Sequence, residues 1–124
     1  MTITKAIIPV AGWGTRRLPI TKSIEKCMLP IGNRPIVDYV VQDCIAAGIT
    51  DIYFVVSEES SQIQAYYEDN GALNTYLIAN GKEDYLPMVA PPKNVKFHYV
   101  VQNTLGKYGT AVTVALVFPK IRHG

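Results

Sequence analysis

The chain has 124 residues, of which 48% are hydrophobic, and its formal net charge at pH 7 is +2. A chain of this length and composition can bury one modest core. The mild charge and the lack of a long apolar run give no reason to expect nucleic acid or a membrane as a partner. The start MTITKAII lacks the apolar region of a signal peptide, and Cys27 and Cys44 do not have metal-ligand spacing. We therefore expect a cytoplasmic protein with reduced thiols.

Residues 3–10 are mostly apolar or β-branched, which predicts a strand covered on both faces in a parallel sheet. The glycines Gly12 and Gly14 follow this strand, where backbone N–H groups can form an anion site. Four cations come next in the chain: Arg16, Arg17, Lys22 and Lys26. The combination predicts a polyphosphate site. The glycines alone equally fit a tight turn with solvated arginines, because Arg17 breaks the dinucleotide fingerprint G-x-G-x-x-G.

A helix is predicted from Pro35, which suits a first helical turn, to Gly48, which suits the position after a helix end. The expected buried face of this helix is formed by residues that recur at three- and four-residue steps: Ile36, Tyr39, Val40, Asp43, Cys44 and Ala47. Residues 51–56, DIYFVV, then predict a second buried strand. Strand, helix and strand with short connections form a right-handed parallel crossover, the unit of a doubly wound α/β sheet.

A further helix is expected after Ser57, with Ser60 as its cap and a stripe of Ile63, Tyr66 and Tyr67. We interpret this aromatic stripe as core packing, not as a base-stacking platform. Another helical segment is predicted over residues 73–78. Residues 82–93 contain several prolines and are interpreted as a loop.

Alternating apolar residues predict a third strand over residues 95–102, followed by a helix over 108–118. His98 lies on the opposite face of this strand from the apolar residues. It has no partner at ligand spacing, so we interpret it as a sheet or surface histidine and expect no metal ligand in this chain.

The residues from 6 to 49 closely resemble the N-terminus of bacterial UTP–glucose-1-phosphate uridylyltransferases, which are UDP-glucose pyrophosphorylases of the sugar-phosphate nucleotidyltransferase family. The family pattern is P-x-A-G-x-G-T-R-x-L-P-x-T-K, then P-K-E-M-L-P, then a helix ending in A-G-I. The matching residues in the two motifs are Pro9, Ala11, Gly12, Gly14, Thr15, Arg16, Leu18, Pro19, Thr21, Lys22, Lys26, Met28, Leu29 and Pro30.

The resemblance implies a Rossmann-like, doubly wound, mainly parallel α/β sheet, of which residues 1–124 are the N-terminal nucleotide-binding half. It also implies that an oxygen of glucose 1-phosphate attacks the α-phosphorus of UTP, giving UDP-glucose and pyrophosphate. The family binds Mg²⁺ through an aspartate of an L-P-D-x motif, and that aspartate, the sugar-binding half and a further catalytic lysine are expected beyond Gly124. We therefore expect no turnover by this chain alone, and self-association through an exposed sheet edge.

By the same resemblance, Arg16 and Lys26 are the catalytic residues: Arg16 holds the departing phosphates and Lys26 binds phosphate near the reacting centre. The uridine is expected to contact Ala11, Gly12 and Gln102. Gly14 and Thr15 belong to the same nucleotide-binding loop, and Gly109 belongs to the turn after Gln102. Arg17 is interpreted as a solvated surface charge. Lys22 either adds to the phosphate field or pairs with Glu25 or Asp38.

The chain departs from the family pattern where Glu25 replaces proline and Cys27 replaces the glutamate of P-K-E-M-L-P. Glu25 beside Lys26 lowers the local positive charge, and a thiol does not accept hydrogen bonds as a carboxylate does. Near the expected base site, Lys107 replaces a glycine and Thr110 stands where the family often has histidine. Two alternatives therefore stay open: a related transferase acting on dTTP, CTP or ATP, and a non-catalytic regulatory nucleotide-binding paralogue.

Overall fold

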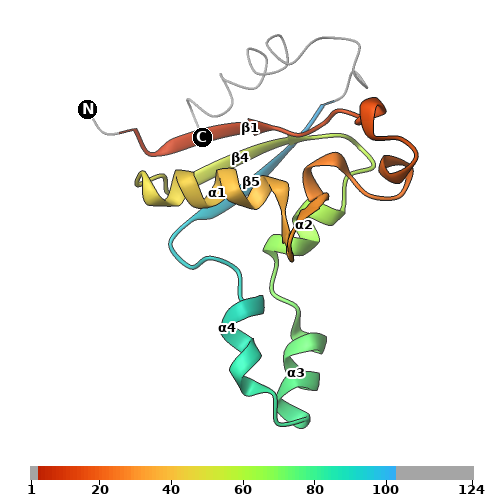
Figure 1. Ribbon diagram of the computed structural model, residues 1–124. Coiled ribbons are helices and arrows are strands. Elements are labelled where there is room, and N and C mark those ends of the chain that lie inside the picture. Colours follow the sequence, from red (N-terminus) through yellow and green to blue (C-terminus); the bar gives the residue numbers. More distant parts are fainter. Residues whose placement is uncertain (1–2, 103–124) are drawn as a thin grey trace.

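The computed structural model describes residues 3–102 as a Rossmann-like α/β structure built on a parallel sheet (Figure 1). The strands β1 (Lys5–Pro9), β4 (Asp51–Val56) and β5 (Lys96–Val101) lie in the order β1-β4-β5, and both neighbouring pairs are parallel. The three predicted strands and their parallel crossover are confirmed. The helix predicted over 108–118 lies outside the described residues.

The central strand β4 is buried on both faces. Ile52, Phe54 and Val56 face one side of the sheet, and Tyr53 and Val55 face the other. Residues alternate between the faces of a strand, so a sequence that is apolar at every position can fill two layers of core. The outer strand β1 has a partly buried centre and exposed ends.

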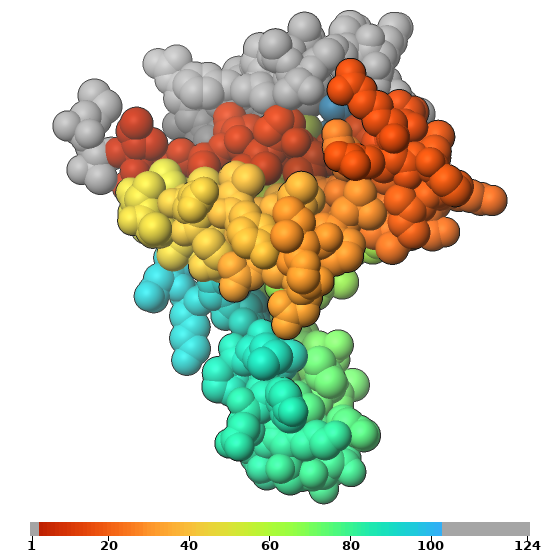
Figure 2. All heavy atoms as spheres, in the orientation of Figure 1, coloured from red at the N-terminus to blue at the C-terminus, as the bar shows by residue number. Residues whose placement is uncertain are grey.

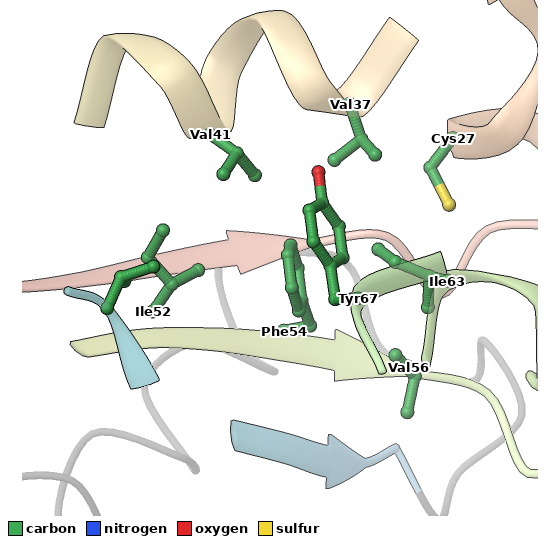
Figure 3. Close-up of a cluster of buried hydrophobic side chains, with 9 residues drawn as sticks. Cys27, Val37, Val41, Ile52, Phe54, Val56, Ile63 and Tyr67 are labelled. Atoms are coloured by element: carbon green, nitrogen blue, oxygen red, sulfur yellow. The ribbon is translucent and has the colours of Figure 1, made fainter. Parts of the chain in front are cut away.

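The helices α1 (Ile36–Ala46) and α2 (Gln62–Tyr67) cover one face of the sheet. In Figure 3, Val37 and Val41 point from α1 toward the hydrophobic core that includes Ile52 and Phe54 of β4. The buried face of α1 expected from the sequence was wrong in most positions, because five of its six members are exposed and only Cys44 is partly buried. The segment IVDYVV is apolar on most sides of a helix, so spacing alone does not fix the rotation of α1 about its axis.

A buried hydrogen-bond network joins α1 to α2. The Tyr67 hydroxyl donates to Asp38 Oδ1 at 2.7 Å, and Arg34 Nε lies 3.3 Å from Asp38 Oδ2. Burial, followed by the hydrogen bond to Asp38, raises the pKa of Tyr67, so the phenol stays a donor. Lys22 is therefore not the partner of Asp38.

Replacing Tyr67 with phenylalanine is expected to lower the free energy of unfolding by about 1–3 kcal/mol, because the buried Asp38 carboxylate loses one partner. Urea unfolding followed by circular dichroism measures this change. The control is Tyr66→Phe, whose side chain is exposed, and which is expected to change stability by less than about 0.5 kcal/mol. Equal effects of the two substitutions would contradict the network's role.

Two helices project from the sheet as an arm (Figures 1 and 2). They are α3 (Gly71–Ala79), which Asn70 caps by accepting from the Leu73 N–H at 3.0 Å, and α4 (Leu86–Val89), which follows the short 3₁₀ turn η4 (Glu83–Tyr85). The prediction of a loop over 82–93 was therefore wrong in part, because a proline in the first turn is compatible with a helix. Within the described ranges no helix is long and apolar enough to cross a membrane.

His98 faces Asp51 near the amino ends of β5 and β4. Its Nε2 lies 3.0 Å from Asp51 Oδ1, and its ring stacks on Tyr53 with 4.3 Å between centroids. His98 is thus a sheet histidine, as interpreted. Residues 3–102 contain no cluster of three or more metal-ligating side chains.

The contact predicts a pH dependence of stability. The hydrogen bond from His98 lowers the pKa of Asp51 below its usual range. Folding then favours the ionised carboxylate, so this contribution is present above the unfolded pKa of about 4 and is lost as the pH falls through the folded value. Urea unfolding between pH 3 and 7 measures this effect. As the pH falls, the free energy of unfolding should decrease more steeply for the natural chain than for Asp51→Asn. Parallel curves would contradict the contact's role.

Candidate nucleotide-binding site

The loop after β1 is folded around Gly14. The 3₁₀ turns η1 (Thr15–Arg17) and η2 (Ile20–Lys22) follow it. The Gly14 carbonyl accepts from the Arg17 N–H and from the buried Thr21 hydroxyl, each at 2.9 Å. Gly14 has φ +68°, in the left-handed region that favours glycine.

Gly14 also lies against Lys26, the first residue of the turn η3 (Lys26–Met28). A Cβ on Gly14 would lie 3.0 Å from Lys26 Cβ and 3.1 Å from Thr21 Cγ2. By contrast, nothing lies within 4 Å of a Cβ placed on Gly12. The two glycines therefore have different roles: Gly14 permits a close packing contact, and Gly12 leaves open space beside the backbone.

In the described part of the chain, two cavities beside this loop are both lined by Gly12 and Lys26. The larger, of about 650 Å³, is lined by Gly12, Arg17 and Lys26 and by an apolar wall that includes Cys27 and Ile36. The smaller, of about 250 Å³, is lined by residues from both strand ends and from the loop, among them Ala11, Gly12, Trp13, Lys22, Lys26 and Ser57. Gly12 and Lys26 line both cavities.

In the described part of the chain the cations at these cavities form no ion pair, although Glu25 and Glu59 also line the smaller cavity. Within residues 3–102, no ion pair involves Arg16, Arg17, Lys22 or Lys26. A cation without a fixed partner keeps its attraction for an anionic ligand. The loop therefore has the electrostatic character required to bind phosphate groups.

The carboxyl ends of the three strands meet at this loop. The Val10 N–H donates to the Val55 carbonyl at 2.8 Å, and the Gln102 N–H donates to the Val56 carbonyl at 2.7 Å. Gln102 thus continues β5 at the sheet edge where Ala11 continues β1. Ligands of open parallel sheets bind at this edge. The other residue expected near the base, Gly109, lies outside the described residues.

The two arginines of η1 are both exposed and differ in whether they line the larger cavity. Arg17 lines the larger cavity together with Lys26. Arg16 is exposed on η1 and lines neither cavity, and Thr15 lines a third, largely apolar cavity of about 480 Å³ beside Trp13 and Leu18. The catalytic role expected for Arg16 stays a prediction, and Arg17, which is exposed as expected, is a further candidate because it lines the larger cavity.

The two departures from the family motif have structural roles. Cys27 is buried in the core, and burial, with a smaller effect of Glu25, raises the pKa of its thiol to about 12. A thiol that stays protonated is a poor nucleophile, which argues against redox chemistry at Cys27. The carboxylate of Glu25 accepts hydrogen bonds from Ser60 and from the backbone at the start of α2. Glu25 is therefore not a partner of Lys22, and Ser60 does not cap α2 as expected.

A parallel sheet with a glycine loop and an accessible lysine at the carboxyl ends of its strands defines an α/β nucleotide-binding protein. Residues 5–123 match the nucleotidyl transferase family, and the chain belongs to this family. It is 38% identical over 116 residues to a putative UTP–glucose-1-phosphate uridylyltransferase from Bacillus subtilis (strain 168), an alignment that covers 94% of this chain and 42% of the relative.

Solved structures have the same architecture. A UDP-glucose pyrophosphorylase from Acinetobacter baumannii superposes with a TM-score of 0.89 at 34% identity, covering 97% of this chain and 42% of that chain. A UTP-bound UGPase from the same organism has a TM-score of 0.75 at 36% identity, covering 82% and 36%. The chain thus spans about two fifths of the length of the relatives it matches. The expected family and fold are confirmed.

Proposed function

We propose that this chain is the nucleotide-binding half of an enzyme that converts UTP and glucose 1-phosphate into UDP-glucose and pyrophosphate. The observation that carries the proposal is the position of Lys26 and Gly12, which line both cavities at the carboxyl edge of the sheet. The name of the Bacillus subtilis relative and the UTP in a solved relative support the choice of reaction and nucleotide.

In this reaction an oxygen of the sugar phosphate attacks the α-phosphorus of UTP, and pyrophosphate leaves. The protein accelerates such a step mainly by positioning the reactants and stabilising developing charge. We assign Lys26 and Arg16 to the phosphates, with Arg17 as a further candidate because it lines the cavity beside Lys26. The open backbone at Ala11 and Gly12 and the amide of Gln102 are assigned to uridine.

No three metal-ligating side chains cluster within residues 3–102. We propose that the metal ligand lies outside this chain, together with the sugar-binding half, and that this chain alone does not turn over. Within residues 3–102, β1 and β5 form the two edges of the sheet, and such edges favour self-association. The free thiols Cys27 and Cys44 fit a cytoplasmic enzyme.

One observation favours a second candidate, a related transferase that uses another nucleotide. Cys27 lines the larger cavity, and its thiol offers no carboxylate to a nucleoside where the family motif has glutamate. The nucleotide preference therefore needs direct measurement.

Titration of the chain with UTP, dTTP, CTP and ATP tests both candidates. Trp13 is the only tryptophan and lines the smaller cavity, so its fluorescence reports binding directly. We expect UTP to bind most tightly, with calorimetry as an independent readout. Tighter binding of another nucleotide would favour the second candidate.

The complete gene product distinguishes an enzyme from a non-catalytic paralogue. A coupled assay should detect pyrophosphate release from UTP only when glucose 1-phosphate is present. Absence of release with every nucleotide and sugar phosphate, despite nucleotide binding, would leave the regulatory paralogue as the function.

A further inference from the structure

Glu25 and Gln62 bind each other across 37 positions of the chain. The Glu25 carboxylate accepts from the N–H groups of Gln62 at 2.6 Å and Ser61 at 3.2 Å, and from the Ser60 hydroxyl. In return, Gln62 Oε1 accepts from the Glu25 N–H at 2.7 Å, and Gln62 Nε2 donates to the Ser23 carbonyl at 2.9 Å. We call these reciprocal bonds the Glu25–Gln62 clamp.

In the clamp, Glu25 accepts hydrogen bonds from the backbone N–H groups at the start of α2, although it lies far from α2 in the sequence. The first N–H groups of a helix have no partner within the helix, and a negative charge there is stabilising. No side chain at the N-cap position of α2 fills this role. Glu25 does so from the loop, and it thereby ties the segment before Lys26 to a helix that packs on the sheet.

Lys26 is consequently held from two sides. The clamp fixes the preceding residue, Glu25, and the close approach of Gly14 limits movement of the Lys26 stem. Lys26 lines both cavities of the candidate site. A flexible four-carbon side chain loses less freedom on binding a ligand when its backbone is already fixed.

We infer that the Glu25–Gln62 clamp is a positioning device for Lys26 and that Glu25, although acidic, promotes the binding of phosphate groups through it. The inference rests on the proposed function, because it takes a nucleoside triphosphate as the ligand. It also assigns a role to the residue that replaces proline in the family motif.

The test measures the dissociation constants of UTP and inorganic pyrophosphate for the chain and its variants. Glu25→Ala and Gln62→Ala should weaken both ligands about tenfold, because Lys26 is no longer prepositioned. Glu25→Gln should stay within about twofold, since its amide can accept from both backbone N–H groups and donate to Ser60. The matched control is Gln64→Ala on the same helix, because the Gln64 amide donates to Glu68 and takes no part in the clamp.

A Lys26→Met background separates positioning from a general structural effect. If Glu25 acts through Lys26, adding Gln62→Ala to Lys26→Met should cause no further loss of pyrophosphate affinity. A full tenfold loss in that background would overturn the inference, as would unchanged affinity in Gln62→Ala. Tighter binding by both Glu25→Ala and Glu25→Gln would show that Glu25 acts by its charge, and would also overturn it.

Hydrogen exchange keeps this result separate from the proposed function. The Met28 N–H donates to the Glu25 carbonyl at 2.8 Å and the Leu29 N–H to the Lys26 carbonyl at 3.2 Å. Faster exchange of these two amides in Gln62→Ala supports the clamp, whether or not the natural chain binds a ligand. If the natural chain bound neither UTP nor pyrophosphate, only the proposed function would be contradicted. Unchanged exchange would overturn the clamp.

Discussion

Replacing Gly14 with alanine is expected to remove UTP binding and to lower the free energy of unfolding by about 2–5 kcal/mol. Two costs combine. A left-handed conformation costs a residue with a Cβ about 1–2 kcal/mol, and overpacking against Lys26 Cβ at 3.0 Å adds about 1–3 kcal/mol. Relief of either cost would displace Lys26 or Thr21, so the binding loop changes together with stability. Urea unfolding and a UTP titration measure the two effects.

Two other glycines provide matched controls. Gly32 has the same φ of +68° but open space where the Cβ would lie, so Gly32→Ala should show the conformational cost alone and leave UTP binding intact. Gly12 has no strained φ and no close neighbour, so Gly12→Ala should keep stability and weaken UTP. If Gly14→Ala costs no more stability than Gly32→Ala, the contact with Lys26 has no energetic role.

The strands could be predicted from the sequence because each is a continuous apolar run that pairs in parallel with its neighbours. The rotation of α1 could not, because IVDYVV is apolar around most of the helix and only packing on β4 selects Val37 and Val41. The hairpin of β2 (Pro30–Ile31) and β3 (Arg34–Pro35) was also missed. Two residues per strand are too few to give a periodic signal.

The residues of the candidate binding loop could be predicted from the local sequence, but the contacts that hold the loop in place could not. Gly12, Gly14 and Lys26 lie within one short segment, and the structure brings them together at the strand ends. Glu25 was expected to act on local charge, yet its partners lie more than thirty residues away on α2. No local pattern indicates such a contact. Thr21 is buried and donates to the Gly14 carbonyl. Its match to the family motif was the one sequence feature that marked Thr21 as important.

Removing the charge of Lys26 is expected to weaken UTP about a hundredfold, which corresponds to about 2.7 kcal/mol of binding free energy. Lys26→Met is the informative change, because methionine retains most of the aliphatic stem that packs on Gly14. Its stability should therefore stay close to that of the natural chain. Calorimetric titration with UTP measures the loss, and Lys82→Met, which removes a charge from the projecting arm, is the control for net charge.

The same titration ranks the two arginines. Arg17→Ala should weaken UTP in the isolated chain, because Arg17 lines the cavity beside Lys26. Arg16→Ala should act mainly on turnover by the complete protein, at a cost of several kcal/mol in transition-state stabilisation, on the order of other lost phosphate contacts. Unchanged turnover in Arg16→Ala would remove its assignment as a catalytic residue. Equal UTP affinity of Lys26→Met and Lys82→Met would show that phosphate does not bind at the cavities that Lys26 lines, and the proposed nucleotide site would have to lie elsewhere.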